Sequence, residues 1–335
     1  FAVPVVCPVC HEHPLQRVGD QLVCPDHTSD DCPREFAISN GFPDPIVGGR
    51  FDDPTDDECM TYEEGSNLYT AERYWVPLFR RLYPRHEKRQ PRILAVGCGT
   101  GVEVDVLNRA GFDCVGIDNG NRTKVWPRRE HCDNFLLANG LNLPFPDRTF
   151  DGVFCGCVFP HVGVVGDTST VNDHYFEDRL QLAREMVRVL RVGGHATVGS
   201  PSRLFPFDIF HGRTPGSYKP RVNLPTNPFL LSFGDYRKLF SAAGCARAEP
   251  LPVDGYWGFV RSKHSLKGRL LGAPVQANFW LVSQPWARLL RRSPPRAEAH
   301  PRARRRAHGR AGGDRVSRRG QDARERCHGG DLACA

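Results

Sequence analysis

Short apolar runs alternate with helical repeats of apolar residues through the middle of the chain. Ile93–Val96 and Cys114–Ile117 have the length and composition of buried strands, and the apolar positions between them recur at helical spacing. Val153–Val158 is apolar enough for a central strand. The helical repeat that follows ends at Gly193-Gly194, ahead of a further strand at His195–Gly199. Strands that alternate with helices form parallel sheets, so we predict an α/β fold.

Candidate chemistry first appears in a glycine-rich turn, Gly97-Cys98-Gly99-Thr100-Gly101, between the first strand and its helix. Glycine lets the backbone approach a ligand closely, and N–H groups at the start of a helix favour an anion or carboxylate. Asp118 ends the second strand, where such units place the carboxylate that binds ribose hydroxyls. The G-x-G-x-G spacing suits a ligand without phosphate. The alternatives are a turn with no ligand or a nicotinamide cofactor, and a plain turn role for Asp118.

Residues 91–212, which contain this turn, resemble in family order the class I S-adenosylmethionine-dependent methyltransferases of the methyltransferase type 11-like group. The first motif of that family has an acidic residue where this chain has Ala95, and Asn139 stands where the family frequently has an Asp that reads the adenine. The resemblance implies a Rossmann-like methyltransferase sheet, mostly parallel and seven-stranded with an antiparallel last strand. It also implies S-adenosylmethionine as cofactor, held by Gly97, Cys98, Gly99, Gly101, Asp118, Asn119, Asn139 and Gly140.

Near the amino end, two pairs of cysteine and histidine residues have the spacing of metal ligands. Cys7-Pro-Val-Cys10 is followed by Cys24-Pro-Asp-His27, and Leu15–Val23 between the pairs reads as a short hairpin. Thiolate and imidazole pairs separated by two residues can reach one tetrahedral ion, so we predict a zinc ribbon that is stabilised by Zn²⁺. The predicted ligands are Cys7, Cys10, Cys24 and His27, with Cys32 as the substitute for His27. The alternatives are unliganded thiols or a redox pair.

The segment after these cysteines, Arg34–Ile46, is similar to the short zinc-ribbon proteins that activate RNA and protein methyltransferases. Gly41-Phe42-Pro43 fills the place of their "G-I-P" turn. The segment resembles less closely the amino-terminal finger of large-subunit ribosomal RNA guanine-N1 methyltransferases. Both resemblances imply a ribbon joined to a methyltransferase domain.

Composition shifts along the chain indicate its organisation. We predict a zinc ribbon at 1–50, followed by a linker and capping helix at 51–90. The acidic part of this linker, 51–64, is predicted to be exposed, and the helix is predicted to begin near Ser66. The predicted methyltransferase domain covers 91–265, with an insertion near 203–232 and a closing strand region at 250–260. An extension at 266–290 leads to an Arg-rich tail at 291–335, which is predicted to be disordered or a shifted reading frame.

Methyl transfer requires alignment of the nucleophile, methyl and sulfur and exclusion of water, and it requires a general base only if the acceptor is protonated. His161 follows the Val153–Val158 strand at the carboxyl edge, so it is the first candidate base. Asp173, His174 and His211 are further candidates from loops on that side.

The acceptor is predicted from the insertion, which is aromatic and proline-rich and therefore suits a small-molecule or lipid-like acceptor. An RNA acceptor remains as an alternative because Arg203, Arg213, Lys219 and Arg221 lie nearby and a ribbon could position RNA. A third hypothesis is a cofactor-binding scaffold without catalysis, since Ala95 and Asn139 depart from the family pattern. Nothing in the sequence indicates the oligomeric state.

The charge distribution and the cysteine content bear on possible partners and on the cellular compartment. The net charge is +7, but the tail from residue 291 has thirteen Arg against five acidic residues, so the other residues together carry about −1. The basic character therefore belongs to the tail, which is an alternative RNA-binding arm. Thirteen cysteines spread through predicted strands fit a reducing compartment, so we expect a cytoplasmic protein. No apolar stretch approaches the length that crosses a bilayer.

Overall fold

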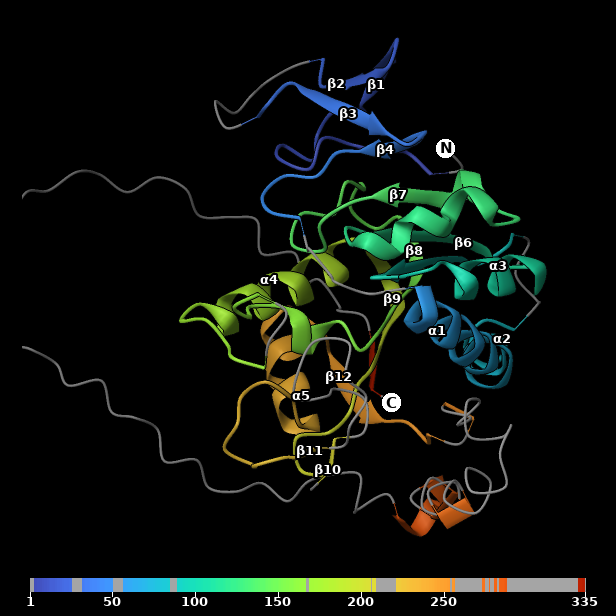
Figure 1. Cartoon of the computed structure of the whole chain (residues 1–335), viewed down its shortest axis with the longest axis vertical. Coiled ribbons are helices and arrows are strands. Elements are labelled where there is room, and N and C mark those ends of the chain that lie inside the picture. The colour runs from blue at the N-terminus through green and yellow to red at the C-terminus, as the bar shows by residue number, and fades with distance from the viewer. Residues whose placement is uncertain are drawn as a thin grey trace, which may run out of the picture.

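Two sheets of different size organise the molecule (Figure 1). The computed structural model describes residues 3–25, 32–50, 57–84, 89–166, 169–205, 207–208, 221–253, 255–256, 273–274, 277, 280–281, 283–287 and 331–334. The small sheet, β1 to β4, lies at one end, and the larger sheet has helices on both faces. No helix among these described residues combines the length and the apolar composition needed to cross a membrane.

The larger sheet is built on five parallel strands in the order β9-β8-β5-β6-β7. Their bounds are Arg92–Val96 for β5, Asp113–Asp118 for β6, Phe135–Leu137 for β7, Phe150–Gly156 for β8 and Leu190–Gly199 for β9. Strand β12 (Arg247–Pro250) and strand β13 (Asp331–Cys334) continue it beyond β9 in the order β12-β13-β9. The predicted parallel α/β sheet is confirmed.

The prediction of an antiparallel last strand is wrong. Strand β13 pairs in parallel with both β12 and β9, and it comes from residues 331–334 rather than from the predicted closing region at 250–260. Within that region Leu251–Val253 is not a strand, and Pro252 lacks the N–H that a sheet ladder needs.

Both faces of the central strands are buried, because their side chains alternate between two cores. Leu94 and Val96 of β5 lie in the core under α4 and α5, whereas Ile93 and Ala95 lie in the core under the amino-terminal helices and α3. The helices are α1 (Asp57–Thr70), the π-helix η1 (Ala71–Trp75), α2 (Val76–Leu82), α3 (Val102–Arg109), α4 (Tyr175–Arg188) and α5 (Phe233–Ala242). Short 3-10 segments are η2 (Asn121–Arg128), η3 (Cys132–Asn134), η4 (Phe159–His161) and η6 (Pro285–Ala287).

The amino-terminal helical region begins earlier than predicted. Helix α1 starts at Asp57, inside the segment predicted to be an exposed acidic linker, rather than near Ser66. Glu63 accepts two hydrogen bonds from Arg122, at 2.6 and 2.8 Å, and Glu64 forms an ion pair with Arg129. Acidic side chains that look solvated in the sequence are therefore held by arginines about sixty residues away.

Two boundaries around the central strands also differ from the prediction. Strand β8 ends at Gly156 rather than Val158, since the next residue, Cys157, has a φ of +57°, which is incompatible with a strand. Helix α4 ends at Arg188 rather than at Gly193-Gly194. Those glycines lie inside β9, where Gly193 has a φ of +80° beside a register shift in the pairing with β8.

The amino-terminal unit is a four-stranded antiparallel sheet. Its strands are β1 (Gln16–Val18), β2 (Gln21–Val23), β3 (Glu35–Ser39) and β4 (Phe42–Asp44). The predicted hairpin turns at Gly19, whose φ is +61°. The unit packs on the larger sheet through the Val6 N–H, which donates to the Pro144 carbonyl at 2.9 Å, and through Phe42, whose ring lies edge-on to Trp126 at 5.3 Å.

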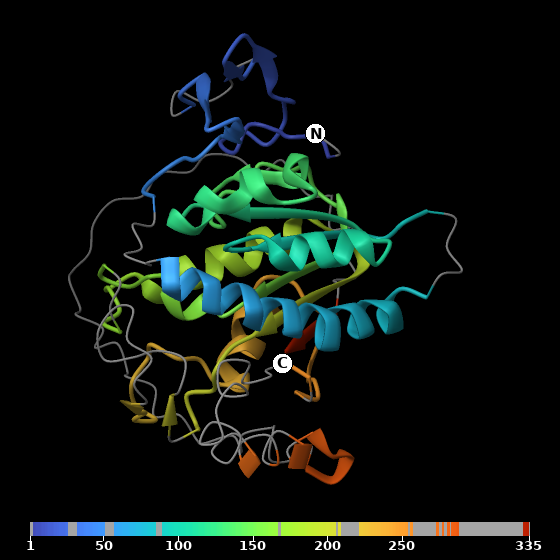
Figure 2. The ribbon, with the colours of Figure 1, turned by 45° about the vertical axis from the view of Figure 1, so that its right-hand side comes forward.

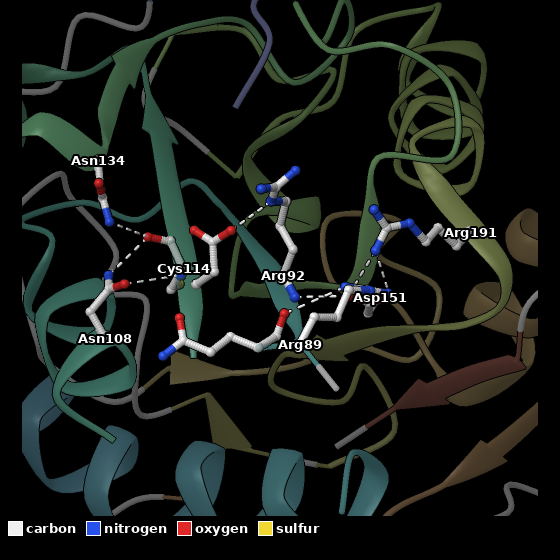
Figure 3. Close-up of polar contacts among 9 residues, drawn as sticks. Arg89, Arg92, Asn108, Cys114, Asn134, Asp151 and Arg191 are labelled. Atoms are coloured by element: carbon white, nitrogen blue, oxygen red, sulfur yellow. Dashed lines mark hydrogen bonds and ion pairs between the residues drawn. The ribbon is translucent and has the colours of Figure 1, made fainter. Parts of the chain in front are cut away.

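A polar network closes the amino edge of the sheet (Figure 3). Asp151 of β8 accepts hydrogen bonds from Arg89 at 2.7 and 2.5 Å, from Arg191 at 3.0 and 3.1 Å and from the Arg92 backbone N–H at 2.8 Å. Burial opposes ionisation, but these donors outweigh it and lower the pKa of Asp151 to about 2. The network fixes the start of β8 against β5.

We expect Asp151→Asn to lower the free energy of unfolding at pH 7 by about 1–2 kcal/mol. The pKa of Asp151 is lower in the folded state, so its contribution is fully present above about pH 4 and is lost as the pH falls toward 2. Urea unfolding of wild type and variant at pH 7, 4 and 3 measures this difference. If the difference in unfolding free energy between wild type and Asp151→Asn stays constant from pH 7 to pH 3, the lowered pKa of Asp151 is contradicted.

Candidate functional site

The glycine turn follows β5 directly and leads into α3. Gly97, Gly99 and Gly101 have φ values of +66°, +53° and +82°, a region that side chains disfavour. A Cβ at Gly97 would lie 2.4 Å from the Val158 side chain, and one at Gly101 would lie 2.5 Å from the Phe135 ring. Glycine is therefore required at both positions by conformation and by packing.

Asp118, the last residue of β6, holds this turn through its carboxylate. Oδ2 accepts the Gly99 N–H at 2.8 Å, and Oδ1 accepts the N–H groups of Asn119 and Gly120, each at 2.8 Å. Burial raises the pKa of Asp118, and the three N–H groups counter that rise. A carboxylate offers about four lone-pair sites, so one more donor fits after these three.

Two residues that the sequence analysis missed hold the turn from its carbonyl side. The Trp126 indole N–H donates to the Gly99 carbonyl at 2.8 Å, and the Arg129 guanidinium donates to the Thr100 carbonyl at 2.7 Å. Trp126 is fully buried and stacks on Phe135 with ring centroids 4.8 Å apart. These contacts have no local sequence signal, because each donor lies nearly thirty residues along the chain from the carbonyl that it binds.

Cys98 and Ala95 contribute no polar side chain to the turn. The Cys98 side chain is buried against Gly116, and its N–H donates to the Ile117 carbonyl at 2.9 Å. Ala95 is buried in β5, in register with Gly116 and Phe154 on the neighbouring strands. Within the part of the chain that the structure describes, Asp118 is the carboxylate that hydrogen-bonds to the turn.

Asn139 and Gly140 follow β7 at the same edge. Asn139 Oδ1 accepts the Leu141 N–H at 3.0 Å, so the side chain caps its own loop. Its Nδ2 donates to the Val47 carbonyl at 3.4 Å, in the segment that leaves the amino-terminal sheet. A Cβ at Gly140 would lie 2.9 Å from Leu182, so this position packs directly on α4.

The candidate bases are spread over the loop between β8 and α4. His161 ends η4, its N–H donates to the Val158 carbonyl at 2.9 Å, and its ring lies edge-on to Phe229 at 6.0 Å. Asp173 and His174 are exposed just before α4. His211 lies outside the described residues. The structure brings His161 close to the insertion. The loop folds back on itself, with the Asn172 N–H donating to the Gly163 carbonyl at 2.8 Å, and Asp173 and His174 follow on its exposed side.

Arg179 joins the His161 loop to the insertion, a role that its helical position did not suggest. It is buried in α4 and donates to the carbonyls of Pro160 and Val162 at 3.3 and 3.1 Å. The same guanidinium donates to the carbonyls of Pro228 and Phe229 at 2.7 and 3.0 Å. One buried cation thus fixes two loops at the carboxyl side of β8.

The insertion carries exposed apolar side chains. Its hairpin pairs β10 (Phe207–Asp208) with β11 (Arg221–Val222), and the side chains of Leu204, Phe205, Val222 and Leu224 are exposed. An exposed apolar group of this kind is typical of a surface that contacts an apolar ligand or partner. Of the cations noted from the sequence, Arg203 forms an ion pair with Asp235 at 2.7 Å, and Arg213 and Lys219 lie outside the described residues.

Four thiols converge in the amino-terminal unit. The Sγ atoms of Cys7, Cys10 and Cys24 lie within 4.8 Å of one another. The Cys32 Sγ lies 3.5 Å from the Cys7 Sγ. Burial raises the pKa of the Cys7 thiol to about 12. His27, the predicted fourth ligand, lies outside the described residues, whereas Cys32 is buried beside the other thiols.

Comparison with known proteins finds similarity to methyltransferases in the segment that contains the glycine turn. Residues 94–198 match the family model described as "Methyltransferase domain". A "Probable S-adenosylmethionine-dependent methyltransferase" of Mycolicibacterium smegmatis is 25% identical over 221 residues, which are 64% of this chain and 75% of that protein. The matched residues include the glycine turn, Asp118 and Asn139.

Other similar proteins differ in their described acceptors. The "Probable tRNA methyltransferase 9B" of Mus musculus is 28% identical over 131 residues, 37% of this chain, and the chain spans about a quarter (26%) of that protein. The crystal structure of the sugar N-methyltransferase KedS8 from Streptoalloteichus covers 59% of this chain and 88% of its own, with 17% identity and a TM-score of 0.41.

Proposed function

We propose that this chain transfers a methyl group from S-adenosylmethionine to a small-molecule or lipid-like acceptor. The observation that carries the proposal is the glycine turn between β5 and α3, which is held in shape by Asp118 within the segment that matches the methyltransferase family. The family match and the relatives support S-adenosylmethionine-dependent methyl transfer as the class of activity. The acceptor class and the residue roles below are our proposals.

The residues at this edge fit an adenosyl ligand. Asp118 has one lone-pair site left for a ribose hydroxyl, and the turn brings bare backbone at Gly97 and Gly99 next to it. The backbone of Asn119 lies beside the Asp118 carboxylate and would contact the ligand there. Asn139 and Gly140 follow β7, and we place the adenine next to them. Cys98 and Gly101 serve through the backbone alone, because the Cys98 side chain faces the core.

When bound, S-adenosylmethionine supplies an activated methyl group on a positively charged sulfur. The chain's residues then have to orient the acceptor and exclude water from the line of attack. Arg179 and Phe229 hold the loop that carries His161, so an acceptor bound there would meet the His161 imidazole. His161 would accept a proton only from an acceptor that is protonated at neutral pH.

The acceptor proposal rests on the exposed apolar residues of the insertion, Leu204, Phe205, Val222 and Leu224. Apolar contact area favours a small or lipid-like molecule, whereas an RNA surface is expected to present unpaired Lys and Arg. Arg203 is paired with Asp235, which weakens the RNA reading at that position.

The amino-terminal unit fits a structural zinc site. Four cysteine sulfurs in a small sheet match the preference of Zn²⁺ for tetrahedral thiolate ligands. We therefore propose Cys7, Cys10, Cys24 and Cys32 as the ligands, with Cys32 in place of His27. Residues 1–50 would then form a ribbon ahead of the methyltransferase domain at 91–265.

The full chain should bind S-adenosylmethionine with micromolar affinity by calorimetry, since the turn and Asp118 are already in place. The next measurement is formation of S-adenosylhomocysteine with three acceptor sets: small phenols and amines, phospholipid vesicles, and bulk RNA. Turnover with the first or second set supports the proposal, and turnover with RNA alone replaces it by the RNA alternative. Binding without turnover in all sets favours a scaffold, and no binding contradicts the proposal.

A further inference from the structure

Exposed apolar side chains gather in two segments that are far apart in the sequence. The insertion group, on which the acceptor proposal rests, consists of Leu204, Phe205, Val222 and Leu224. The tryptophan group, which has no role in the function proposed above, consists of Trp280, Leu281 and Trp286. Seven of the twelve large apolar side chains exposed in the described part of the chain belong to these groups, and each of the other five lies in a different element or loop. A concentration of this kind indicates a contact surface, whereas single exposed apolar residues are ordinary.

Both groups lie at one end of the molecule, beyond β12 and opposite to the amino-terminal unit (Figure 1 and Figure 2). The hairpin β10–β11 and the orange segment that contains η6 occupy this end in both views, which differ by a turn about the long axis. The two segments therefore project from the sheet in the same direction. Side chains that project past one end can rest on one flat surface at the same time, even when they do not touch each other.

The insertion group is linked to the loop that carries the candidate base. The Asn223 side chain donates to the Phe205 carbonyl at 3.1 Å and joins the two sides of the hairpin. The same segment continues to Phe229, whose carbonyl accepts from Arg179 at 3.0 Å and whose ring lies edge-on to His161. A surface that binds the insertion group would therefore lie next to the loop that is proposed to receive the acceptor.

The tryptophan group is attached to the chain that leaves β12. The Val253 N–H donates to Ser283 Oγ at 3.1 Å, and the Gln284 side chain donates to the Trp280 carbonyl at 3.1 Å. Trp280 and Trp286 nevertheless expose 57% and 64% of their surface. Tryptophan combines a large apolar ring with one N–H donor, so it is favourable where the acyl chains of a bilayer meet the headgroups.

The shape and charge of this end fit a lipid surface. Small-molecule sites are concave, whereas both groups project from the molecule on exposed side chains. The sequence of 202–228 and 280–287 contains three Arg and one Lys, and Asp208 is its single acidic residue. Asp208 lies opposite Arg221 in the hairpin. Phosphate-bearing headgroups would therefore meet little negative charge and a net positive one.

We propose that the insertion group and the tryptophan group dock this chain on the surface of a lipid bilayer. Their apolar side chains would enter the boundary between headgroups and acyl chains, with the indole N–H groups at headgroup level. The inference rests on the proposed function for its lipid-like acceptor, which would reach the His161 loop directly from the membrane. Docking itself requires no turnover, so it can be measured separately.

Sedimentation of the full chain with vesicles, in the absence of S-adenosylmethionine, measures docking. The tail from residue 291 contains thirteen Arg and would attract anionic headgroups by charge alone, so vesicles of phosphatidylcholine alone are the deciding probe. We expect the wild type to bind them and the double variant Trp280→Ser with Trp286→Ser to bind at least about tenfold more weakly. The double variant Phe205→Ser with Leu224→Ser should show a similar loss through the other group.

The matched control removes apolar side chains of similar exposure elsewhere. Val18 in β1 and Val192 in β9 are 60% and 61% exposed, and neither belongs to the two groups. The double variant Val18→Ser with Val192→Ser should bind phosphatidylcholine vesicles as the wild type does. Thermal unfolding shows whether each variant is folded, and if one group's variant is unfolded, the variant of the other group decides.

Several results would overturn docking. One is a wild type that does not bind phosphatidylcholine vesicles, including one that binds only mixtures with phosphatidylglycerol and releases them at high salt. Another is an equal loss in the control variant, or no loss in either group's variant. A chain that binds no vesicles but is a dimer in light scattering, and a monomer in the Trp280→Ser with Trp286→Ser variant, would assign the tryptophan group to a second copy.

The same measurements keep docking and methyl transfer apart. Loss of docking leaves calorimetric binding of S-adenosylmethionine to the glycine turn unchanged, so the proposed function would stand with an acceptor taken from solution. Vesicle binding by a chain that does not bind S-adenosylmethionine would contradict the proposed function and leave the docking surface in place.

Discussion

Replacing Asp118 with alanine is expected to weaken S-adenosylmethionine binding by about 10²- to 10⁴-fold. The carboxylate has two tasks, since it accepts N–H groups from Gly99, Asn119 and Gly120 and is proposed to accept from the ribose. Its loss would leave the turn without its anchor and the ligand without a charge-assisted hydrogen bond. Calorimetric titration of the full chain measures the effect.

The matched control for this change lies on the same strand. Asp113 begins β6 at the opposite edge of the sheet and pairs with the Arg92 guanidinium at 2.7 Å. Asp113→Asn should therefore leave S-adenosylmethionine affinity within about twofold of wild type. If Asp118→Ala binds as tightly as the wild type, Asp118 is a turn residue only and the proposed ribose contact is wrong.

Removing the metal from the amino-terminal unit is expected to unfold β1 to β4 and to leave the larger sheet folded. The unit buries few apolar side chains of its own, chiefly Leu22 and Phe36 around the cysteines. Structural Zn²⁺ contributes about 10–16 kcal/mol of apparent binding free energy in zinc-finger peptides, and such a unit depends on it. Hydrogen exchange with and without a chelator measures the protection of β1 to β4 against that of β5.

Ligand identity is tested by the zinc content of single variants. Cys24→Ser and Cys32→Ser should each lose the roughly one zinc per chain that we expect in the wild type, because their thiols lie with Cys7. The matched control is Cys132→Ser, a half-buried cysteine of η3. Zinc retained in Cys32→Ser and lost in His27→Ala would return His27 to the ligand set.

The central strands were predictable from the sequence because burial on both faces leaves near-continuous apolar runs. Ile93–Val96 and Cys114–Ile117 lie within β5 and β6 as predicted. Their boundaries were less predictable where the backbone departs from regular geometry. The φ of +57° at Cys157 ended β8 early, and the register shift between β8 and β9 placed Gly193 within a strand.

The candidate site was predictable only in part, for a related reason. Asp118 could be found because a carboxylate at the end of the second strand has a fixed distance along the chain from the glycines. Trp126 and Arg129 could not be found, since their partners are the carbonyls of the turn. A contact between segments far apart in the sequence produces no periodicity or residue spacing from which it could be predicted.

The sequence by itself determined the alternation of the central strands with helices, the glycine turn with its carboxylate, and the pairs of cysteines. Each of these depends on residues that are close along the chain, where steric limits on backbone and side chains act locally. Only the tertiary structure decided that the acidic segment before Ser66 is helical, that Cys32 joins the thiols, and that Arg179 joins the His161 loop to the insertion. These outcomes depend on packing and charge pairing between segments that are distant in the sequence. Such contacts form, and stabilise the structure, only when the chain folds.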